Sequence, residues 1–529
     1  MYHSYPYPSK RSAVYAPVMA LASNPLAAEA GRTVLEQGGN AIDAAIAMAA
    51  AQTVVEPTSN GLGSDLFTVF SFGGALYGFN GSGKSPASIS PEALQKKGFD
   101  KIPPYGIEPV GVPGAVDAWR TVHEAFGALS FSEVLAPAIR YAKDGFIISP
   151  TVSALWAREL RTRKHCTGPV FDAFWHTFAP KGRAPRPGEI FSNPDQAETL
   201  IAIAESKSEA FYRGTLAEKI SEFSATFGGF LSAADLAAHQ TLRVEPLSLD
   251  FEGTTVYELP PNGHGISVLM ALAMLKPWKI DLDTPLGVHR TVEAVKRAMT
   301  DCARFVTDPD HMRVRCEDLL SDAFIRRRRD DIADTTKIVE YCHPLAPSTV
   351  YFAVGDTAGN MVSMIQSNYD GFGSGVVVPG TGISLNNRLL NFSLEAGHDN
   401  ILAGGKRPYH TIIPGFLTKD GAPYAAFGVM GGFMQPQGHV QTLLRLLVSG
   451  ANPQAALDAP RFMWTGEDRI ACESTYAPEI LDFLRASGHA VTIPGDELDM
   501  GRGQILVREN GVYCGGTEKR CDGYIAALY

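Results

Sequence analysis

The feature that most constrains the fold is a sharp change in sequence pattern near residue 325. Before this point apolar residues recur mostly with helical spacing. Residues 326–348 are instead polar, contain Pro344 and Pro347, and show no regular spacing of apolar residues. Beyond them, residues 349–355 and 361–367 are alternating runs rich in β-branched side chains, joined by a glycine-containing turn. This pattern is typical of an antiparallel β-hairpin that follows a linker. The sequence therefore predicts a helix-rich first part, a linker at about 326–348, and a sheet-rich second part.

The first part predicts helices with a few strands between them. Residues 25–37 have helical spacing and end at a Gly-Gly pair, and a second helix begins at about Asn40 and ends before Pro57. Residues 66–72 and 75–79 have the composition of strands. Further helices are predicted at 113–125, 132–144, 151–162, 194–205, 215–223 and 291–305. Glycine-rich segments gather in the second part, at 371–375, 380–382, 404–405 and 428–432, so we expect the chemistry there.

Composition and charge narrow the class of protein. The 529 residues include 46 Lys and Arg against 56 Asp and Glu, a net charge of -10. Because nucleic-acid binding needs a basic surface, we expect no nucleic-acid partner. Four arginines at 326–329 are followed at once by two aspartates, and we interpret this run as a solvated surface turn. The longest apolar stretch, residues 41–55, is shorter than the ~20 residues of a membrane span, so we expect a cytoplasmic protein without a membrane partner.

Two further patterns bear on cofactors. The seven cysteines are scattered and never spaced Cys-x-x-Cys, and His398, His410 and His439 are far apart in sequence, so we expect free thiols, no metal and no cofactor. Residues 78–85 match the P-loop pattern G-x-x-x-x-G-K-[ST]. That loop binds phosphate where a helix begins at its lysine, and Pro86 opposes a helix there. A nucleotide-binding protein therefore stays only as an alternative from a different class.

The surroundings of Thr349, where the linker becomes a strand, carry a family resemblance. The segments concerned are 349–360, 367–375, 379–387, 392–393, 405–408 and 431–432 in the second part, and 38–45, 55–61, 112–114 and 260–263 in the first. Together they resemble the γ-glutamyltranspeptidase family, in one order and over nearly the whole chain. Many separated segments in a fixed order are far more specific than the P-loop match.

The resemblance implies an α/β (α+β) fold, the four-layer αββα sandwich of N-terminal-nucleophile hydrolases, whose precursors cut themselves before a Thr. Here that bond is Ser348–Thr349, and it would give a large subunit, 1–348, and a small subunit, 349–529, that stay together and can pair as a dimer of heterodimers. Thr349 would then supply the nucleophilic hydroxyl and, as base, a free α-amine with an ordinary pKa of about 7.7–8.0. Ser367 matches the hydroxyl residue that supports the nucleophile, and Gly431 and Gly432 match the glycine pair whose amides stabilise the oxyanion.

The segments that hold the substrate depart from the family pattern. Ser82 stands where an Arg binds the glutamyl carboxylate, and Asn391 stands where an acidic residue receives the α-ammonium. Arg388 replaces a Gln or Glu, and His410-Thr411 replaces a Ser-Ser pair.

These departures predict a small anionic amide without an α-ammonium as the acyl donor. Oxamate, cleaved to oxalate and ammonia, is the best guess, with Arg388 and either Lys84 or His410 binding its carboxylate together with Asn391 and Thr411. The alternatives are a γ-glutamyl hydrolase or transferase, a cephalosporin-acylase-like amidase, and a processed scaffold without activity.

Overall fold

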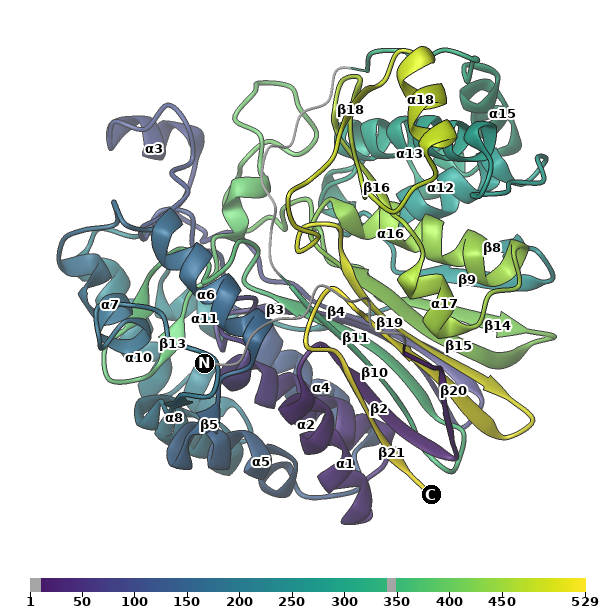
Figure 1. The fold of residues 1–529 in the computed structure, drawn as a ribbon. Helices are drawn as coiled ribbons and strands as arrows, with labels where there is room; N and C mark the ends of the chain where they lie inside the picture. The colour runs from purple at the N-terminus through teal and green to yellow at the C-terminus, as the bar shows by residue number, and fades with distance from the viewer. Residues whose placement is uncertain (1–10, 340–348) are drawn as a thin grey trace.

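A computed structural model describes residues 11–339 and 349–529. At its centre two seven-stranded β-sheets face each other, with helices over both outer faces (Figure 1). All neighbouring strands in the first sheet are antiparallel. In spatial order they are β21 (Tyr524–Leu528), β2 (Val18–Ala22), β10 (Val350–Gly355), β11 (Met361–Ser367), β3 (Asp65–Phe72), β4 (Ala75–Gly81) and β7 (Leu242–Val244).

The second sheet is also antiparallel throughout. In spatial order its strands are β1 (Val14–Ala16), β20 (Val512–Thr517), β19 (Arg502–Glu509), β15 (Ala422–Met430), β14 (Gly415–Lys419), β9 (Thr254–Glu258) and β8 (Leu247–Phe251). The two sheets pack where the ring of Tyr351 lies against Gly428, and where Ser363 Oγ donates to the carbonyl of Phe427 at 3.3 Å. A Cβ on residue 428 would overlap that ring, so this contact requires glycine.

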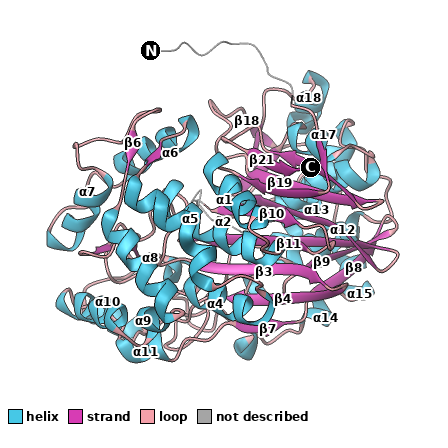
Figure 2. Cartoon of the chain, turned by 90° about the horizontal axis from the view of Figure 1, so that it is seen from below, coloured by secondary structure: helices cyan, strands magenta, loops and turns pink. Residues whose placement is uncertain are grey.

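Helices cover each sheet on the side away from its partner, which confirms the four-layer αββα sandwich (Figures 1 and 2). Figure 2 shows the helices of the first layer crossing the first sheet. These are α1 (Pro25–Glu36), α2 (Ala41–Val55) and α4 (Ala115–Phe126), with α5 (Phe131–Asp144) and α8 (Pro194–Ser206) packed outside α2. The other layer consists of α12 (Ile266–Leu275), α13 (Pro285–Phe305), α16 (Met434–Leu443) and α18 (Pro478–Ala486).

Helix α2 shows why the first layer is so deeply buried. Asn40 caps it by accepting hydrogen bonds from the amides of Ile42 and Asp43, while the Asp43 carboxylate accepts from the amide of Asn40. All its residues are buried, because it lies between the first sheet and α5. A helix that is apolar on every side is expected in such a position.

Each of the two sheets contains strands from both sides of the predicted linker. The β10–β11 hairpin lies between β2 and β3, so that Ala353 pairs with Leu21 and Gln366 pairs with Leu66. At the other edge of β2 lies the carboxyl-terminal strand β21. Neither part of the chain therefore forms a complete sheet by itself.

Smaller elements surround the sandwich. They are α3 (Pro91–Lys96), α6 (Pro150–Thr162), α7 (Asp172–Phe178), α9 (Glu209–Tyr212), α10 (Thr215–Thr226), α11 (Ala233–Ala237), α14 (Cys316–Leu319), α15 (Asp322–Asp330) and α17 (Pro453–Asp458), the strand pairs β5 (Phe146–Ile147) with β6 (Ile190–Phe191) and β12 (Val377–Val378) with β13 (Ile383–Ser384), the three-stranded sheet β16 (Phe462–Gly466), β17 (Arg469–Cys472) and β18 (Ala490–Thr492), and short helical turns η1 (Pro169–Phe171), η2 (Pro309–His311), η3 (Arg388–Asn391) and η4 (Leu444–Val448).

The interpretation of the four arginines as a surface turn is wrong, because they lie in helix α15. Ser321 caps this helix, arginine is a good helix former, and Ile325 on the inner side of the helix is buried. Arg328 pairs with Asp301 of α13, which holds the helix against the second layer. The predicted linker start at 326 is therefore also wrong. Residues 331–339 have no helix or strand, and residues 340–348, which include Ser348, lie outside the described residues.

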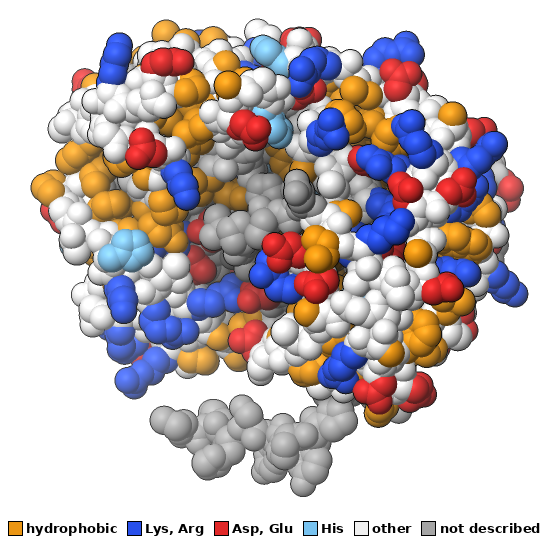
Figure 3. All heavy atoms as spheres, turned by 90° about the horizontal axis from the view of Figure 1, so that it is seen from above, with side chains coloured by type: hydrophobic (Ala, Val, Ile, Leu, Met, Phe, Trp, Pro, Cys, Tyr) orange, Lys and Arg blue, Asp and Glu red, His pale blue; other side chains and the backbone are white. Residues whose placement is uncertain are grey.

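The structure also bears on the P-loop match, the cysteines, membrane insertion and surface charge. No helix begins at Lys84, and the next helix, α3, starts at Pro91, so the P-loop match lacks the structure that binds phosphate. The six described cysteines are free thiols, and Cys342 lies outside the described ranges. None of the described helices is both long and apolar enough to cross a membrane. Figure 3 shows a face on which basic and acidic side chains are interspersed.

Candidate active site

Thr349 lies immediately before β10, in the interior of the first sheet. The hairpin register pairs Val350 with Gln366, which brings Thr349 opposite Ser367 at the end of β11. Thr349 is fully buried, and its Oγ1 donates to Ser367 Oγ at 3.2 Å. Ser367 Oγ also accepts from the amide of Tyr369 at 2.8 Å. The two predicted hydroxyl groups are therefore together, in an orientation that the backbone fixes.

The turn after Ser367 is held by buried polar side chains. Tyr369 has a positive φ of 84°, which is unusual for a bulky residue. Asn368 pins the turn because its Oδ1 accepts from Ser64 Oγ at 2.9 Å. Two residues later, a Cβ on Gly371 would overlap the Glu159 carboxylate, so this closely packed turn requires glycine.

Arg388, His410 and Thr411 gather beside this turn around Asp65, the first residue of β3. Arg388 Nε donates to Asp65 Oδ2 at 3.2 Å, and His410 Nε2 lies 3.0 Å from the same oxygen. Arg388 also donates to Thr411 Oγ1 at 3.1 Å and to the carbonyl of Ser367 at 3.4 Å. Its guanidinium lies 4.9 Å from the ring centre of Tyr369. This buried cluster therefore contacts the pair of hydroxyl residues, Thr349 and Ser367, directly through Ser367.

The cluster is close to electrically neutral. Burial favours the neutral form of the Asp65 carboxyl, but the hydrogen bond from His410 and the charge of Arg388 outweigh burial and hold its pKa below the usual range. Burial and the charge of Arg388 lower the pKa of His410 to about 4. At neutral pH Asp65 is therefore an anion, Arg388 is its counter-ion, and His410 is uncharged and donates its Nε2 proton.

Asn391 is the predicted binding residue with the most open hydrogen-bonding capacity. It ends the η3 turn that begins at Arg388, and it is buried. Neither its side-chain oxygen nor its side-chain nitrogen has a partner among the described residues. A buried amide without partners is costly, and a bound polar ligand would satisfy it.

Lys84 lies apart from the other predicted binding residues. Its side chain is exposed and lines a cavity with Arg407, and Thr349, Ser367 and Arg388 do not line that cavity. The grouping of Arg388, His410 and Thr411 with Thr349 and Ser367 therefore does not extend to Lys84.

Gly431 and Gly432 lie between the end of β15 and helix α16. Their φ values are 134° and 57°, and their carbonyls accept from the amides of Met434 and Gln435. Within the described ranges neither glycine amide has a backbone acceptor. They follow Gly428, which packs on Tyr351, two residues after Thr349. These open amides have the character required of oxyanion donors, and that role stays a prediction.

Asp65 is the main residue that sequence reasoning missed. It stands at the start of a strongly apolar strand, and its neighbours in space come from residues 83, 388 and 410. The sequence did contain one indication, because a carboxylate at the start of a buried strand requires hydrogen-bonding or charged partners. Asn262 was missed in the same way. Its carbonyl accepts from the amide of His410 at 2.9 Å, and its Nδ2 donates to the Pro408 carbonyl at 2.7 Å.

The described ranges contain no group of three or more His, Cys, Asp or Glu side chains arranged to hold a metal ion. His410 and His439 are instead paired with Asp65 and Glu258.

A threonine at the head of a central strand in an αββα sandwich, hydrogen-bonded to a second hydroxyl, is typical of the class of N-terminal-nucleophile hydrolases. Comparison with known proteins gives the family. The family model for Gamma-glutamyltranspeptidase matches residues 27–528. The chain belongs to the γ-glutamyltranspeptidase family.

The relatives are enzymes that cleave amide C–N bonds. The glutathione hydrolase-like YwrD proenzyme of Bacillus subtilis is 36% identical over 96% of this chain and 97% of the relative. The oxamate amidohydrolase proenzyme of Klebsiella pneumoniae is 35% identical over 96% of this chain and 98% of the relative. The crystal structure of cephalosporin acylase from Bacillus halodurans aligns with a TM-score of 0.97 and 49% identity, over 100% of this chain and 99% of that chain. The protein is thus a hydrolase of amide C–N bonds.

Removing the carboxylate of Asp65 tests the buried charge balance. We expect Asp65→Asn, made in the single-chain Thr349→Ala background, to lower the free energy of unfolding by about 3–5 kcal/mol, because Arg388 loses its counter-ion in a buried site. Urea denaturation measures the change. Glu36→Gln, which breaks the exposed ion pair with Arg32, is the control and should cost about 0–1 kcal/mol. A loss under 1 kcal/mol for Asp65→Asn would show that the pair is not needed.

The neutral state of His410 predicts a pH dependence. An unfolded histidine titrates near pH 6.5, whereas folded His410 takes up a proton only near pH 4. Its contribution to stability is therefore present above pH 6.5 and is lost as the pH falls toward 4, by about 1.4 kcal/mol per pH unit.

We expect His410→Gln, which keeps a donor toward Asp65, to make the fall in unfolding free energy between pH 6.5 and 4 shallower by up to that slope. His176→Gln is the control, because solvent hydrates the exposed side chain of His176 in both states. Equal slopes for the His410 variant and the wild type would contradict a neutral His410.

Proposed function

We propose that the chain cuts itself at Ser348–Thr349 and that Thr349 is then the nucleophile of an amidohydrolase for small anionic amides. The observation that carries this proposal is the position of Thr349, buried at the head of β10 with its hydroxyl on Ser367. In the precursor this hydroxyl attacks the carbonyl of Ser348, and the peptide nitrogen of Thr349 takes up the proton as the acyl group moves to oxygen. That shift frees the α-amine, and water then hydrolyses the ester, which releases the Thr349 hydroxyl and leaves Ser348 with a carboxylate.

The freed residue carries out the amide hydrolysis. The α-amine of Thr349 accepts the hydroxyl proton while the oxygen attacks the substrate carbonyl, and Gly431 and Gly432 donate to the resulting oxyanion. The protonated amine gives its proton to the leaving nitrogen, so that ammonia or an amine departs and an ester remains on Thr349. A water molecule, deprotonated by the same amine, cleaves the ester and releases the acid.

The binding groups support a carboxylate-bearing substrate without an ammonium group. The hydrogen bonds of Arg388 within the described structure use three of the five N–H groups of a guanidinium, which leaves two for a substrate carboxylate. Asn391 offers an unpartnered amide on the same turn. The carboxylate of Asp65 is occupied by Arg388, His410 and the amide of Gly83, so it is poorly placed to receive an ammonium.

Oxamate, with oxalate and ammonia as products, is the substrate that we propose first. It carries one carboxylate beside one amide and no ammonium, and a relative at 35% identity is named for this activity. A larger acyl amide is the second candidate, because a cephalosporin acylase matches the whole fold at 49% identity.

We also propose that residues 1–348 and 349–529 stay together after cleavage, as the large and small subunits of the mature enzyme. The insertion of β10 and β11 between β2 and β3 supports this, because separating the two parts would break both strand pairings. A dimer of these heterodimers and a cytoplasmic location are parts of the same proposal. The six described free thiols agree with a reducing compartment.

Substitution of the nucleophile tests processing and turnover together. We expect Thr349→Ala to remain a single 56.8 kDa chain and to release no ammonia from oxamate, because both steps need the hydroxyl. Thr349→Ser is the matched control and should still cut itself and turn over, since it keeps an oxygen nucleophile. Denaturing electrophoresis and an ammonia assay measure the two outcomes. A cleaved or active alanine variant would contradict the mechanism.

Substitution of Asn391 tests the substrate class. We expect Asn391→Asp to lower kcat/KM for oxamate by about tenfold or more, because it places a carboxylate near the anionic substrate, and to raise activity toward a γ-glutamyl anilide. Asn510→Asp makes the same charge change on an exposed turn and should leave both activities as in the wild type. Wild-type enzyme that prefers the γ-glutamyl anilide to oxamate would contradict the proposed substrate and leave the mechanism intact.

A further inference from the structure

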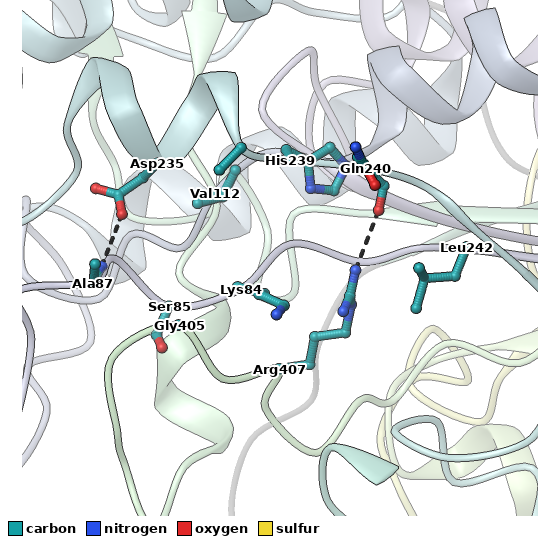
Figure 4. Close-up of a pocket in the computed structure, with 11 residues that line it drawn as sticks. Lys84, Ser85, Ala87, Val112, Asp235, His239, Gln240, Leu242, Gly405 and Arg407 are labelled. Atoms are coloured by element: carbon teal, nitrogen blue, oxygen red, sulfur yellow. Dashed lines mark hydrogen bonds between the residues drawn. The ribbon is translucent and has the colours of Figure 1, made fainter. Parts of the chain in front are cut away.

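A cavity separate from the catalytic threonine lies behind the segment that matched the P-loop pattern. It has a volume of about 320 Å³ and is formed by the loop after β4, the segment between α11 and β7, and the loop that contains Arg407. Figure 4 shows Lys84 and Arg407 on one side of this cavity, with Asp235, His239 and Gln240 across from them. Apolar side chains such as Val112 and Leu242 complete its walls.

The cavity is lined by two cations, Lys84 and Arg407, and by one carboxylate, that of Asp235. Arg407 is only 7% exposed, and its side chain donates to two backbone carbonyls, those of Ser82 at 3.1 Å and Gln240 at 3.2 Å. Among the described residues, no carboxylate oxygen lies within ion-pair distance of Arg407 or of Lys84.

The acidic residues near the cavity are already engaged. Asp235 accepts from the amide of Ala87 at 2.8 Å with one oxygen, and its other oxygen caps helix α11. Asp308 accepts from the backbone amide of Arg407 at 2.8 Å, and its carboxylate lies beyond ion-pair distance of the guanidinium, on which its charge acts only at longer range. His239 is buried and adds no positive charge at neutral pH, since burial lowers its pKa to about 4.

A buried guanidinium with no carboxylate at ion-pair distance is only partly compensated, and an anion that enters the cavity would stabilise it further. The planar guanidinium suits two-oxygen acceptors, and an exposed lysine at the mouth adds a mobile positive charge. We propose that this cavity binds a small oxyanion, carrying a carboxylate or phosphate group, between Arg407 and Lys84. The site is independent of the amide substrate proposed for Thr349.

One peptide unit separates this site from the catalytic cluster. The carbonyl of Ser82 accepts from Arg407, and the amide of Gly83 in the same peptide unit donates to Asp65 Oδ1 at 2.8 Å. Changing Arg407 would therefore disturb Asp65 as well as the cavity. Lys84 is the better residue to substitute, because its exposed side chain holds no described hydrogen bond or ion pair.

The test is calorimetric titration of the wild-type protein with inorganic phosphate and, separately, with malonate, at ionic strength held constant with sodium chloride. We expect saturable binding of one ion per chain, about tenfold weaker in Lys84→Gln, because a charge-assisted contact is lost. Lys219→Gln on the exposed face of α10 is the matched control and should bind as the wild type does. The tighter of the two ions identifies the phosphate or the carboxylate as the preferred group.

Two results would overturn the proposal. One is the absence of saturable binding for both ions beyond the effect of sodium chloride. The other is equal affinity in Lys84→Gln and Lys219→Gln, which would place the ion outside this cavity. Neither result depends on amide hydrolysis, because the same titration can be made on the Thr349→Ala chain, which we expect to be inactive.

Discussion

The pairing of the β10–β11 hairpin between β2 and β3 is the interaction on which the rest of the structure depends. Its register places Thr349 opposite Ser367, and the pairing of β11 with β3 places Ser367 next to Asp65. Asp65 in turn holds Arg388 and His410, which come from distant loops. A shift of one residue in this register would move every side chain of the hairpin to the opposite face of the sheet. The candidate site is therefore a direct consequence of strand pairing.

The charge balance of the site differs from the one that the family comparison implied. Arg388 in place of Gln or Glu, together with Asn391 in place of an acid, indicated an excess of positive charge. Asp65 neutralises Arg388, and His410 is uncharged because burial and the charge of Arg388 lower its pKa. We therefore propose that substrate selection depends less on net charge than on which hydrogen-bonding groups remain open, chiefly the amide of Asn391 and the remaining N–H groups of Arg388.

The elements that depend on nearby residues were predictable from the sequence. The hairpin and helix α2 follow from strand alternation and from an N-cap at Asn40, and both are found within a residue of the predicted bounds. Helix α15 was missed because its charged surface resembles a solvated turn, while the contacts of Ile325 and Arg328 that stabilise it come from the tertiary structure. Charge pattern alone does not reveal such contacts.

The residues of the candidate site were likewise only partly predictable from the sequence. Thr349, Ser367 and the two glycines are recognisable because they lie in family segments, whereas Asp65 belongs to a strand whose sequence shows only burial. Its role depends on residues 83, 388 and 410, which are brought together by the fold. The separation of Lys84 from this cluster also depends on the path of the chain after β4, where the Ser82–Gly83 peptide faces Arg407 on one side and Asp65 on the other.

The most direct test of Thr349 as the nucleophile is to trap the acyl-enzyme. Enzyme turning over oxamate is quenched in acid, and the intact and peptide masses of its fragments are measured. We expect a fragment that begins at Thr349 and a fraction of it heavier by one oxalyl group, located on the peptide that carries this residue. A fragment that begins elsewhere, or an acyl group attached to another residue, would contradict the central role of Thr349.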